Sequence, residues 1–132
     1  MHINQLLQHA NSDLPLLQAN FGLERESLRI NKTNHRLAQT PHPTALGSRQ
    51  FHPYIQTDYS ESQMELITPV AHSSKEVLRF LGAITDVAER SIDQNQYLWP
   101  LSMPPQITED EIEIAQLEDD FEFSYRQYLD KK

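Results

Sequence analysis

Two short acidic pairs are the residues of this chain best suited to chemistry. Glu24 and Glu26 stand two apart in a segment, 23–30, with the composition of a strand. Side chains alternate between the faces of a strand, so both carboxylates project from one face, about 6.5–7 Å apart. Asp58 and Glu65 bracket a second strand-like run. Four acids on adjacent strands would supply the hard oxygen ligands that Mg²⁺ prefers. The pattern predicts a site for magnesium and the ATP phosphates that accompany it.

The ordinary interpretation of two glutamates at this spacing is the solvated face of a strand. Leu28 and Ile30 continue the same face with apolar side chains, which predicts that the face is partly covered. Arg25 and Arg29 point to the opposite face, so no basic partner for the glutamates is evident. A covered pair of like charges is unfavourable unless a cation or another partner binds there. These features strengthen the case for a site, while the solvated face stays the ordinary interpretation of the pair taken alone.

The second acidic pair also has ordinary alternatives. Asp58 could simply cap a turn, and Glu65 could lie at the rim of the sheet. Glu65 is the stronger candidate because it stands inside an apolar strand, where a carboxylate is uncommon unless it has a partner. Both are retained as candidate metal ligands.

Other chemistries find less support in the sequence. The six histidines are scattered, and none has another histidine three or four residues away, so a zinc site is not indicated. Cysteine is absent, which excludes disulfides and thiolate ligands. There is no G-x-S-x-G nucleophile motif, and the three glycines form no Walker-type loop. ATP phosphates would therefore have to be held by cations and basic side chains. No side chain is assigned as a catalytic acid, base or nucleophile.

The elements that would position the acids follow from periodicity and turn residues. Ser73 and Glu76 form a capping box before an apolar stripe of helical spacing, and three prolines exclude a helix at 97–105. The last helical pattern stops at Lys132 without a cap, as expected for part of a longer protein. The order of elements predicts an α+β fold with an antiparallel sheet and helices packed on one side. Strands are expected at 23–30, 36–39, 51–56 and 63–68, and helices at 2–10, at 74–93 and from about 121.

Composition narrows the class of protein. The 132 residues have the size of one modest domain or of a piece of a larger one. The net charge of −8 leaves no basic footprint for nucleic acid or for an anionic membrane surface. No apolar run is long enough to span a bilayer, and no signal peptide is evident. These properties, together with the absence of cysteine, predict a cytoplasmic location.

Three long motifs, in this order and spacing, resemble the N-terminal part of bacterial glutamate–cysteine ligase. They are Phe21–Arg29, Ile55–Pro69 and Trp99–Pro104, and the segment Arg49–Ile55 is most similar to bifunctional members, in which an ATP-grasp domain follows the ligase. The resemblance implies a fold similar to glutamine synthetase, with a sheet curved around the active site. It also implies a two-step reaction. ATP phosphorylates the γ-carboxylate of L-glutamate, and the amine of L-cysteine then attacks the acyl phosphate.

The resemblance assigns roles to particular residues. Glu24, Glu26 and Glu65 match the family's metal-binding carboxylates, and Asp58 matches an acid at the metal and cysteine side. Tyr125 and Arg126 match a Tyr-Arg pair that lies near the substrate pocket in this family. The implied cation is Mg²⁺, with Mn²⁺ as a substitute, and ATP is a substrate. Where some relatives have a cysteine after Ser-Met-Pro, this chain has Pro105, so no redox role attaches to that position.

The resemblance also sets an expectation for the whole chain. Residues 1–132 correspond to the N-terminal portion of the ligase catalytic domain, and the family's later histidine ligand motif lies outside them. A fragment of this kind is expected to be inactive alone and to self-associate through exposed sheet edges. The competing hypothesis is a non-catalytic acidic binding or regulatory domain whose carboxylates are only solvated.

Overall fold

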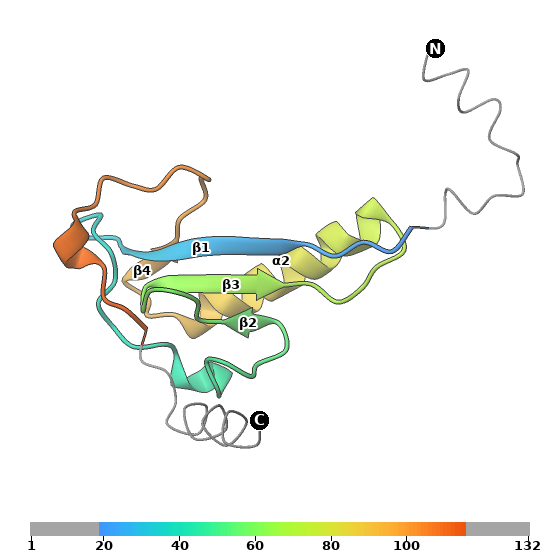
Figure 1. Cartoon of the computed structure of the whole chain (residues 1–132), viewed down its shortest axis with the longest axis horizontal. Coiled ribbons are helices and arrows are strands. Elements are labelled where there is room, and N and C mark those ends of the chain that lie inside the picture. Colours follow the sequence, from blue (N-terminus) through green and yellow to red (C-terminus); the bar gives the residue numbers. More distant parts are fainter. Residues whose placement is uncertain (1–18, 116–132) are drawn as a thin grey trace, which may run out of the picture.

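The computed structural model describes residues 19–115, and these form a small α+β unit (Figure 1). Four strands, one long helix and two short 3₁₀ helices follow one another along the chain. Their bounds are β1 Glu24–Asn31, η1 Thr44–Leu46, β2 Ile55–Gln56, β3 Gln63–Ile67, α2 Ser74–Ser91, β4 Gln96–Leu98 and η2 Glu109–Glu111. The helices expected at 2–10 and from about 121 lie outside the described residues. No helix within 19–115 is long and apolar enough to cross a membrane.

The strands form one antiparallel sheet with the order β2-β3-β1-β4. β1 and β3, which carry the predicted glutamates, are the two central strands, and they pair from Glu24 opposite Ile67 to Leu28 opposite Gln63. The edge strands are short, with two residues in β2 and three in β4. The acidic strands therefore lie in the most constrained part of the sheet. Self-association through the edges stays a prediction.

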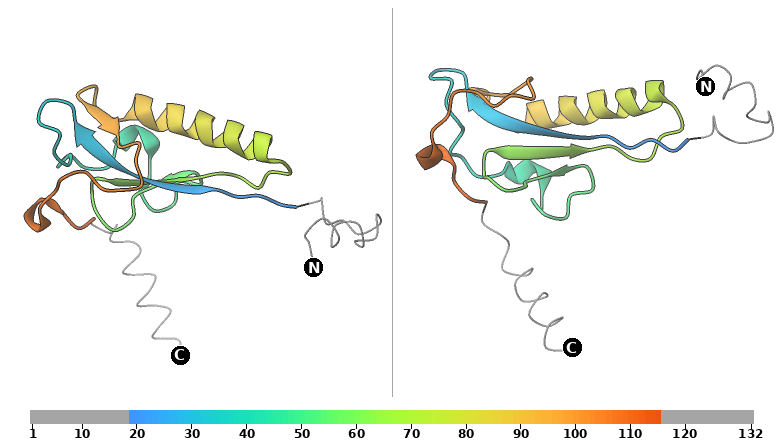
Figure 2. Two further views of the ribbon diagram at one scale, coloured as in Figure 1. Left: turned by 90° about the horizontal axis from the view of Figure 1, so that it is seen from above. Right: turned by 45° about the horizontal axis from the view of Figure 1, so that its top comes forward.

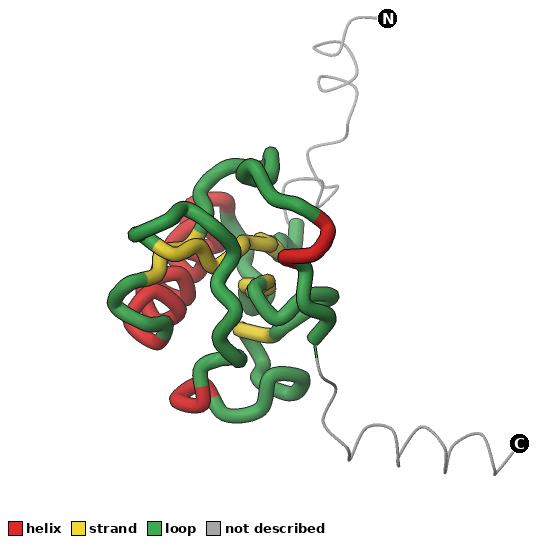
Figure 3. The backbone as a smooth tube through the Cα atoms, turned by 90° about the vertical axis from the view of Figure 1, so that its left-hand side faces the viewer, coloured by secondary structure: helices red, strands yellow, loops and turns green. Residues whose placement is uncertain are grey.

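Helix α2 packs on one face of the sheet, as the views across and along the strands show (Figures 2 and 3). On that face Met64 and Leu66 of β3 are fully buried. Apolar residues of α2, including Ala88, complete the core with Ile55 and Leu98. The residues of β3 that alternate with Met64 and Leu66 must then face away from the helix. One-sided packing thus leaves a second face on which polar groups can gather.

The sequence signals for α2 are confirmed, with one difference at its start. Ser73 is the N-cap, and its hydroxyl accepts a hydrogen bond from the backbone N–H of Glu76 at 3.2 Å. In a capping box the Glu76 carboxylate would accept from Ser73, but here it accepts from the backbone N–H of His72 at 2.8 Å. The reciprocal bond is therefore shifted by one residue. The helix ends at Ser91, two residues before its expected end.

Two predicted strands are shorter than expected, and one strand was missed. The return strand at 36–39 is reduced to a single bridge between Ile30 and Leu37. The strand at 51–56 keeps only Ile55 and Gln56, because the ring nitrogen Nδ1 of His52 accepts from the backbone N–H of Ile55 at 2.9 Å and holds the preceding residues in a turn. The segment after α2 contains β4, which was expected only to be non-helical. Its backbone pairs with the end of β1.

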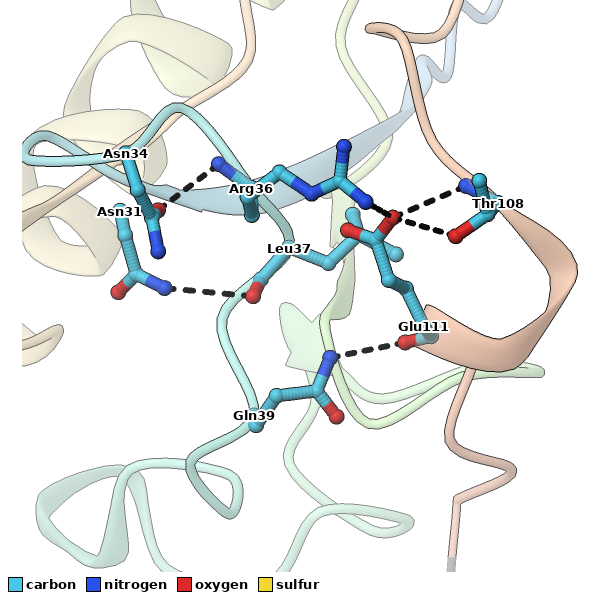
Figure 4. A network of polar contacts seen from close by, with 7 residues as sticks. All are labelled: Asn31, Asn34, Arg36, Leu37, Gln39, Thr108 and Glu111. Carbon is cyan, nitrogen blue, oxygen red and sulfur yellow. Dashed lines mark hydrogen bonds and ion pairs between the residues drawn. The ribbon is translucent and has the colours of Figure 1, made fainter.

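The turn after β1 and the helix η2 are joined by a polar network (Figure 4). The carboxylate of Glu111 accepts hydrogen bonds from Thr108 and forms an ion pair with Arg36. These contacts lower the pKa of Glu111. The amide of Gln39 donates to the Glu111 backbone carbonyl at 2.8 Å. Asn34 accepts from the backbone N–H of Arg36, as expected of a turn asparagine. This network ties the segment after β4 to the end of β1.

Candidate metal centre

The register of the two central strands brings the predicted acids together. Glu26 of β1 lies directly opposite Glu65 of β3, and Glu24 lies opposite Ile67. Directly opposed residues of antiparallel strands have Cβ atoms about 4.5–5.5 Å apart and share one face of the sheet. Because Met64 and Leu66 face the helix, these glutamates lie on the other face. That face is covered only toward Ile30, and Glu24 and Glu26 themselves are exposed, so the expectation of a covered acidic pair is wrong. Two like charges directly opposite each other are destabilising unless something compensates them.

Asp58 reaches the same face from the loop between β2 and β3. The side-chain amide of Gln63 joins it to the glutamates: Gln63 Nε2 donates to Glu26 Oε2 at 2.9 Å and to Asp58 Oδ2 at 3.2 Å. A carboxylate oxygen can only accept, so the nitrogen of the amide must face both acids. All four predicted carboxylates therefore lie in one neighbourhood, with an amide between two of them.

The electrostatics of the group show how closely the acids interact. Partial burial and the carboxylates of Glu24, Asp58 and Glu26 raise the pKa of Glu65. No ion pair formed within residues 19–115 involves any of the four acids. The excess negative charge is therefore without a basic partner in this part of the chain.

The two arginines of β1 do point away from the acids, as predicted. Arg25 Nη2 donates to the backbone carbonyl of Trp99 at 3.5 Å. Arg29 is fully buried and donates to groups of other loops. The alternation of β1 thus separates its acidic side chains from its basic ones.

The chemistry of the donor set fits a magnesium ion, but the present arrangement is not a closed coordination shell. The donors are carboxylate oxygens, the ligand type that Mg²⁺ and Mn²⁺ prefer. Partial burial and the repulsion between the carboxylates raise the pKa of Glu65, and a divalent cation would relieve the repulsion. Within the described part of the chain, however, no three acidic or histidine side chains are close enough together to hold a metal ion. Binding would require the carboxylates to move inward.

A buried polar network lies behind the loop that carries Asp58, and the sequence did not reveal it. Arg29 is 1% exposed and donates to the backbone carbonyls of Thr40 at 2.5 Å and Glu61 at 2.6 Å. Glu61, 6% exposed, accepts an ion pair from Arg49 at 2.5 Å. Glu61 follows Asp58 by three residues, but its carboxylate points inward and pairs with the guanidinium of Arg49. It is a structural acid rather than a candidate ligand.

The same network holds the loop at its other end. Thr57 Oγ1 lies 2.7 Å from the ring nitrogen Nδ1 of His42, and the Thr57 N–H donates to the backbone carbonyl of Arg49 at 2.9 Å. Asp58 therefore lies between two anchored residues, Thr57 and Glu61. These contacts fix the backbone from which the Asp58 carboxylate reaches the glutamates.

His42 makes this network sensitive to acid. Burial and the cations of Arg49 and Arg29 lower the pKa of His42 from 6.5 to about 4. The unfolded chain would take up this proton near pH 6.5, whereas the folded chain would take it up only near pH 4. His42 therefore contributes stability that is fully present above pH 6.5 and is lost as the pH falls to 4, on the order of 2–3 kcal/mol.

We expect urea unfolding at a series of pH values to show this loss in the wild-type chain and a shallower decline in His42→Asn, which keeps a polar group near Thr57. His72→Asn, at an exposed histidine, is the matched control and should follow the wild type. Equal slopes for His42→Asn and the wild type would contradict this assignment.

A pocket of about 200 Å³ opens beside the acids. One side is formed by β1 and β3, including Glu26 and Gln63, and the other by the loop Trp99–Pro104. The loop is held in shape by two hydrogen bonds, from the indole Nε1 of Trp99 to the Met103 carbonyl at 2.6 Å and from the Ser27 hydroxyl to the Trp99 carbonyl at 2.8 Å. The pocket adjoins the metal-binding candidates, so a small molecule in it would lie next to a bound cation.

The two predicted substrate residues, Tyr125 and Arg126, lie outside the described residues. Their placement near the pocket stays a prediction. So does the role of each of the four acids as a metal ligand, although the structure brings these four together on one face.

The chain that forms this acid-bearing pair of strands, with a helix on the opposite face, also matches a known protein family. Residues 3–132 match the family model for glutamate–cysteine ligase. The chain belongs to the glutamate–cysteine ligase family.

Two relatives indicate which members of the family are similar. The chain is 66% identical over 131 residues to the glutathione biosynthesis bifunctional protein GshAB of Streptococcus agalactiae. The aligned region covers 99% of this chain and 18% of that protein. It is 52% identical over 134 residues to the protein of the same name in Enterococcus faecalis, with 100% and 18% covered. The similarity to bifunctional members is thus confirmed. The chain spans less than a fifth of the length of these relatives.

Two solved structures share the fold. A bifunctional glutathione synthetase from Pasteurella multocida superimposes with a TM-score of 0.72 and 43% identity, covering 87% of this chain and 15% of that one. Glutamate–cysteine ligase from Francisella tularensis, solved in complex with AMP, gives a TM-score of 0.72 at 27% identity, covering 76% and 20%. The α+β arrangement is therefore one that known members of the family contain.

Proposed function

We propose that this chain supplies metal-binding carboxylates to an enzyme that joins the γ-carboxylate of L-glutamate to L-cysteine at the expense of ATP, the first step of glutathione biosynthesis. Membership of the ligase family supports the reaction class. A relative of the same fold binds AMP, which supports a nucleotide substrate. The reaction would pass through γ-glutamyl phosphate. In this proposal the enzyme is cytoplasmic, and the described sheet is part of a larger sheet similar to that of glutamine synthetase.

The observation that carries the proposal is the convergence of four acids on one face. Glu26 and Glu65 are paired across the central strands, and Asp58 joins them through Gln63. Glu24, Glu26 and Glu65 would be the ligands, and Asp58 would contribute from the loop. Bound magnesium would neutralise phosphate charge during transfer of the phosphoryl group.

The chain's own side chains have a defined task in this scheme. The glutamates must be ionised to bind a cation, and the raised pKa of Glu65 makes its ionisation less favourable than that of an isolated glutamate. β1 and β3 hold the carboxylates on a rigid central pair of strands, and the network behind Glu61 fixes the loop of Asp58. The neighbouring pocket, which adjoins Glu26, would receive part of a substrate, with Tyr125 and Arg126 as proposed substrate contacts.

A chimera tests the proposal because the chain covers less than a fifth of its relatives. In the Streptococcus agalactiae protein, the segment aligned with this chain is replaced by this chain, and formation of γ-glutamylcysteine is measured. We expect activity that requires ATP, glutamate, cysteine and Mg²⁺ together. A folded chimera that forms no product while the parent protein is active would contradict the proposal and favour a non-catalytic acidic domain.

A further inference from the structure

A second pocket, of about 370 Å³, opens at the end of the sheet where β4 pairs with β1. Its volume lies within the range of about 300–1,000 Å³ that is usual for small-molecule sites. Trp99 lines both this pocket and the one beside the acids. The other lining residues come from the turn after β1, from β4 and from the chain after the proline-rich loop: Asn34, His35, Arg36, Tyr97, Pro105 and Gln106. None of these described residues is an acid, so the pocket is a feature separate from the acidic group.

Two aromatic side chains form an apolar wall of this pocket. Leu98 belongs to the core under α2, so Tyr97 and Trp99, on either side of it, take the opposite face of the sheet. Their ring centroids lie 6.4 Å apart and the ring planes are tilted by 46°, so the two rings do not stack flat on each other. Both residues are half-buried, and the Trp99 indole is held by its hydrogen bond to the Met103 carbonyl. The wall is therefore fixed in shape and keeps aromatic surface for another ring.

Hydrogen-bond donors supplement the aromatic wall. The Arg36 guanidinium pairs with Glu111 through Nη2, which leaves Nη1 and Nε without a bond to any described residue (Figure 4). The Tyr97 hydroxyl and the Gln106 amide likewise make no hydrogen bond to another side chain or backbone group within residues 19–115. Because Glu111 neutralises Arg36, the pocket offers donors but little net charge that would select an anion.

We propose that this pocket binds a neutral, planar heteroaromatic ring of the size of a nucleobase. The ring stacks on Tyr97 and Trp99, and acceptor atoms at its edge receive hydrogen bonds from Arg36 and Gln106. A flat ring suits two fixed aromatic surfaces, and edge acceptors suit a rim of donors. The inference does not rest on the proposed function, since none of the four candidate metal ligands takes part.

The test is an NMR titration of the metal-free 132-residue chain with adenosine, a neutral compound that carries such a ring. Trp99 is the single tryptophan of the chain, so its indole Nε1–H signal is identified without further assignment. Signals of His35 and Gln106 report this pocket alone, whereas those of Glu26 and Gln63 report only the pocket beside the acids. Ribose and inorganic phosphate are titrated separately as ligands that lack the ring.

Two variants remove parts of the proposed site. Tyr97→Leu removes an aromatic surface, and Gln106→Ala removes a donor at an exposed position, where the fold is not at risk. Tyr54→Leu is the matched control for the loss of a tyrosine, because Tyr54 is 41% exposed and lines neither pocket.

We expect adenosine to shift the signals of Trp99, His35 and Gln106, with a dissociation constant of about 1 mM or below. Tyr97→Leu should weaken binding by about fivefold or more, the effect of losing one stacked ring, and Gln106→Ala by about threefold. Tyr54→Leu should bind as the wild type does, and ribose and phosphate should cause no shift.

Three outcomes would overturn the inference. One is no shift with adenosine above about 1 mM. Another is a shift confined to Trp99, Glu26 and Gln63, which would place the ligand in the pocket beside the acids. The third is binding that Gln106→Ala and a folded Tyr97→Leu leave unchanged, or that phosphate alone reproduces. None of these outcomes bears on the proposed function, which the chimera tests independently.

Discussion

Glu65→Gln in the chimera is expected to lower kcat/KM for γ-glutamylcysteine formation by about 100-fold or more, the size of effect found when a preorganised group that stabilises a transition state is removed. Glu65 lies among the other acids: partial burial raises its pKa, and the carboxylates of Glu24, Asp58 and Glu26 raise it further. The amide of glutamine keeps the shape of the side chain and removes the negative charge that a cation needs. Steady-state kinetics at several Mg²⁺ concentrations would measure the loss.

Stability separates this effect from misfolding. A raised pKa means that the folded chain holds the Glu65 proton to higher pH than the unfolded chain does, so ionised Glu65 lowers stability above its folded pKa. Removing the charge should therefore leave metal-free stability unchanged or slightly higher at pH 7. Glu89→Gln, at an exposed position on α2, is the control and should keep full activity. Activity within threefold of the wild type for Glu65→Gln would contradict the assignment of Glu65 as a ligand.

Arg29→Met is expected to lower the free energy of unfolding of the chain by about 3–5 kcal/mol, the usual consequence of breaking a buried charged network by removing one partner. The guanidinium of Arg29 is 1% exposed and satisfies the backbone carbonyls of Thr40 and Glu61. Methionine fills similar volume but leaves both carbonyls without this donor. Since a domain of this size has a stability of about 5–15 kcal/mol, the loss is a large share of the total.

Urea unfolding of the metal-free chain would measure this change. Arg90→Met is the control, because Arg90 is exposed on α2 and its ion pair with Asp86 joins residues four apart on the helix surface. A pair of that kind contributes only about 0.3–0.5 kcal/mol. Should Arg29→Met and Arg90→Met lose similar stability, the buried network would not have the structural role described above.

The shared face of the glutamates on the central strands could be predicted from the sequence, because strand alternation determines which face each side chain takes. Alternation places Glu24 and Glu26 on one face of β1, and antiparallel pairing with β3 brings Glu65 opposite Glu26. Helix α2 could also be predicted, because its N-cap and apolar stripe are local sequence signals. Where a single periodicity or a single cap decides the structure, the sequence was sufficient.

The direction of side chains in irregular segments could not be predicted in this way. Asp58 and Glu61 belong to one loop, but one reaches the acidic face and the other turns inward to Arg49. That difference depends on contacts with residues distant in the sequence, such as Arg29 and His42. The placement of Gln63 between two acids depends on the same loop. The sequence offered one signal for this placement of Gln63: it is a polar strand residue close to two candidate ligands.

Two short strands illustrate the same limit. β2 contains two residues because the His52 ring holds the residues before it in a turn, a contact that composition does not reveal. β4 follows a helix and precedes a proline-rich loop, so its three residues carry no clear alternation. Its strand conformation comes from pairing with the end of β1. In both cases tertiary contacts decide the length of the element.

The central claim is that Glu24, Glu26, Asp58 and Glu65 form one divalent cation site, and Mn²⁺ titration followed by NMR tests it most directly. A bound paramagnetic ion broadens the signals of nearby residues, while the acidic segment Glu109–Glu111 of η2 serves as an internal comparison within the same chain. We expect substoichiometric Mn²⁺ to broaden the backbone signals of the four acids and of Gln63 first, and excess Mg²⁺ to reverse this. Broadening that begins at Glu109–Glu111, or that spreads evenly over all acidic residues, would contradict the claim.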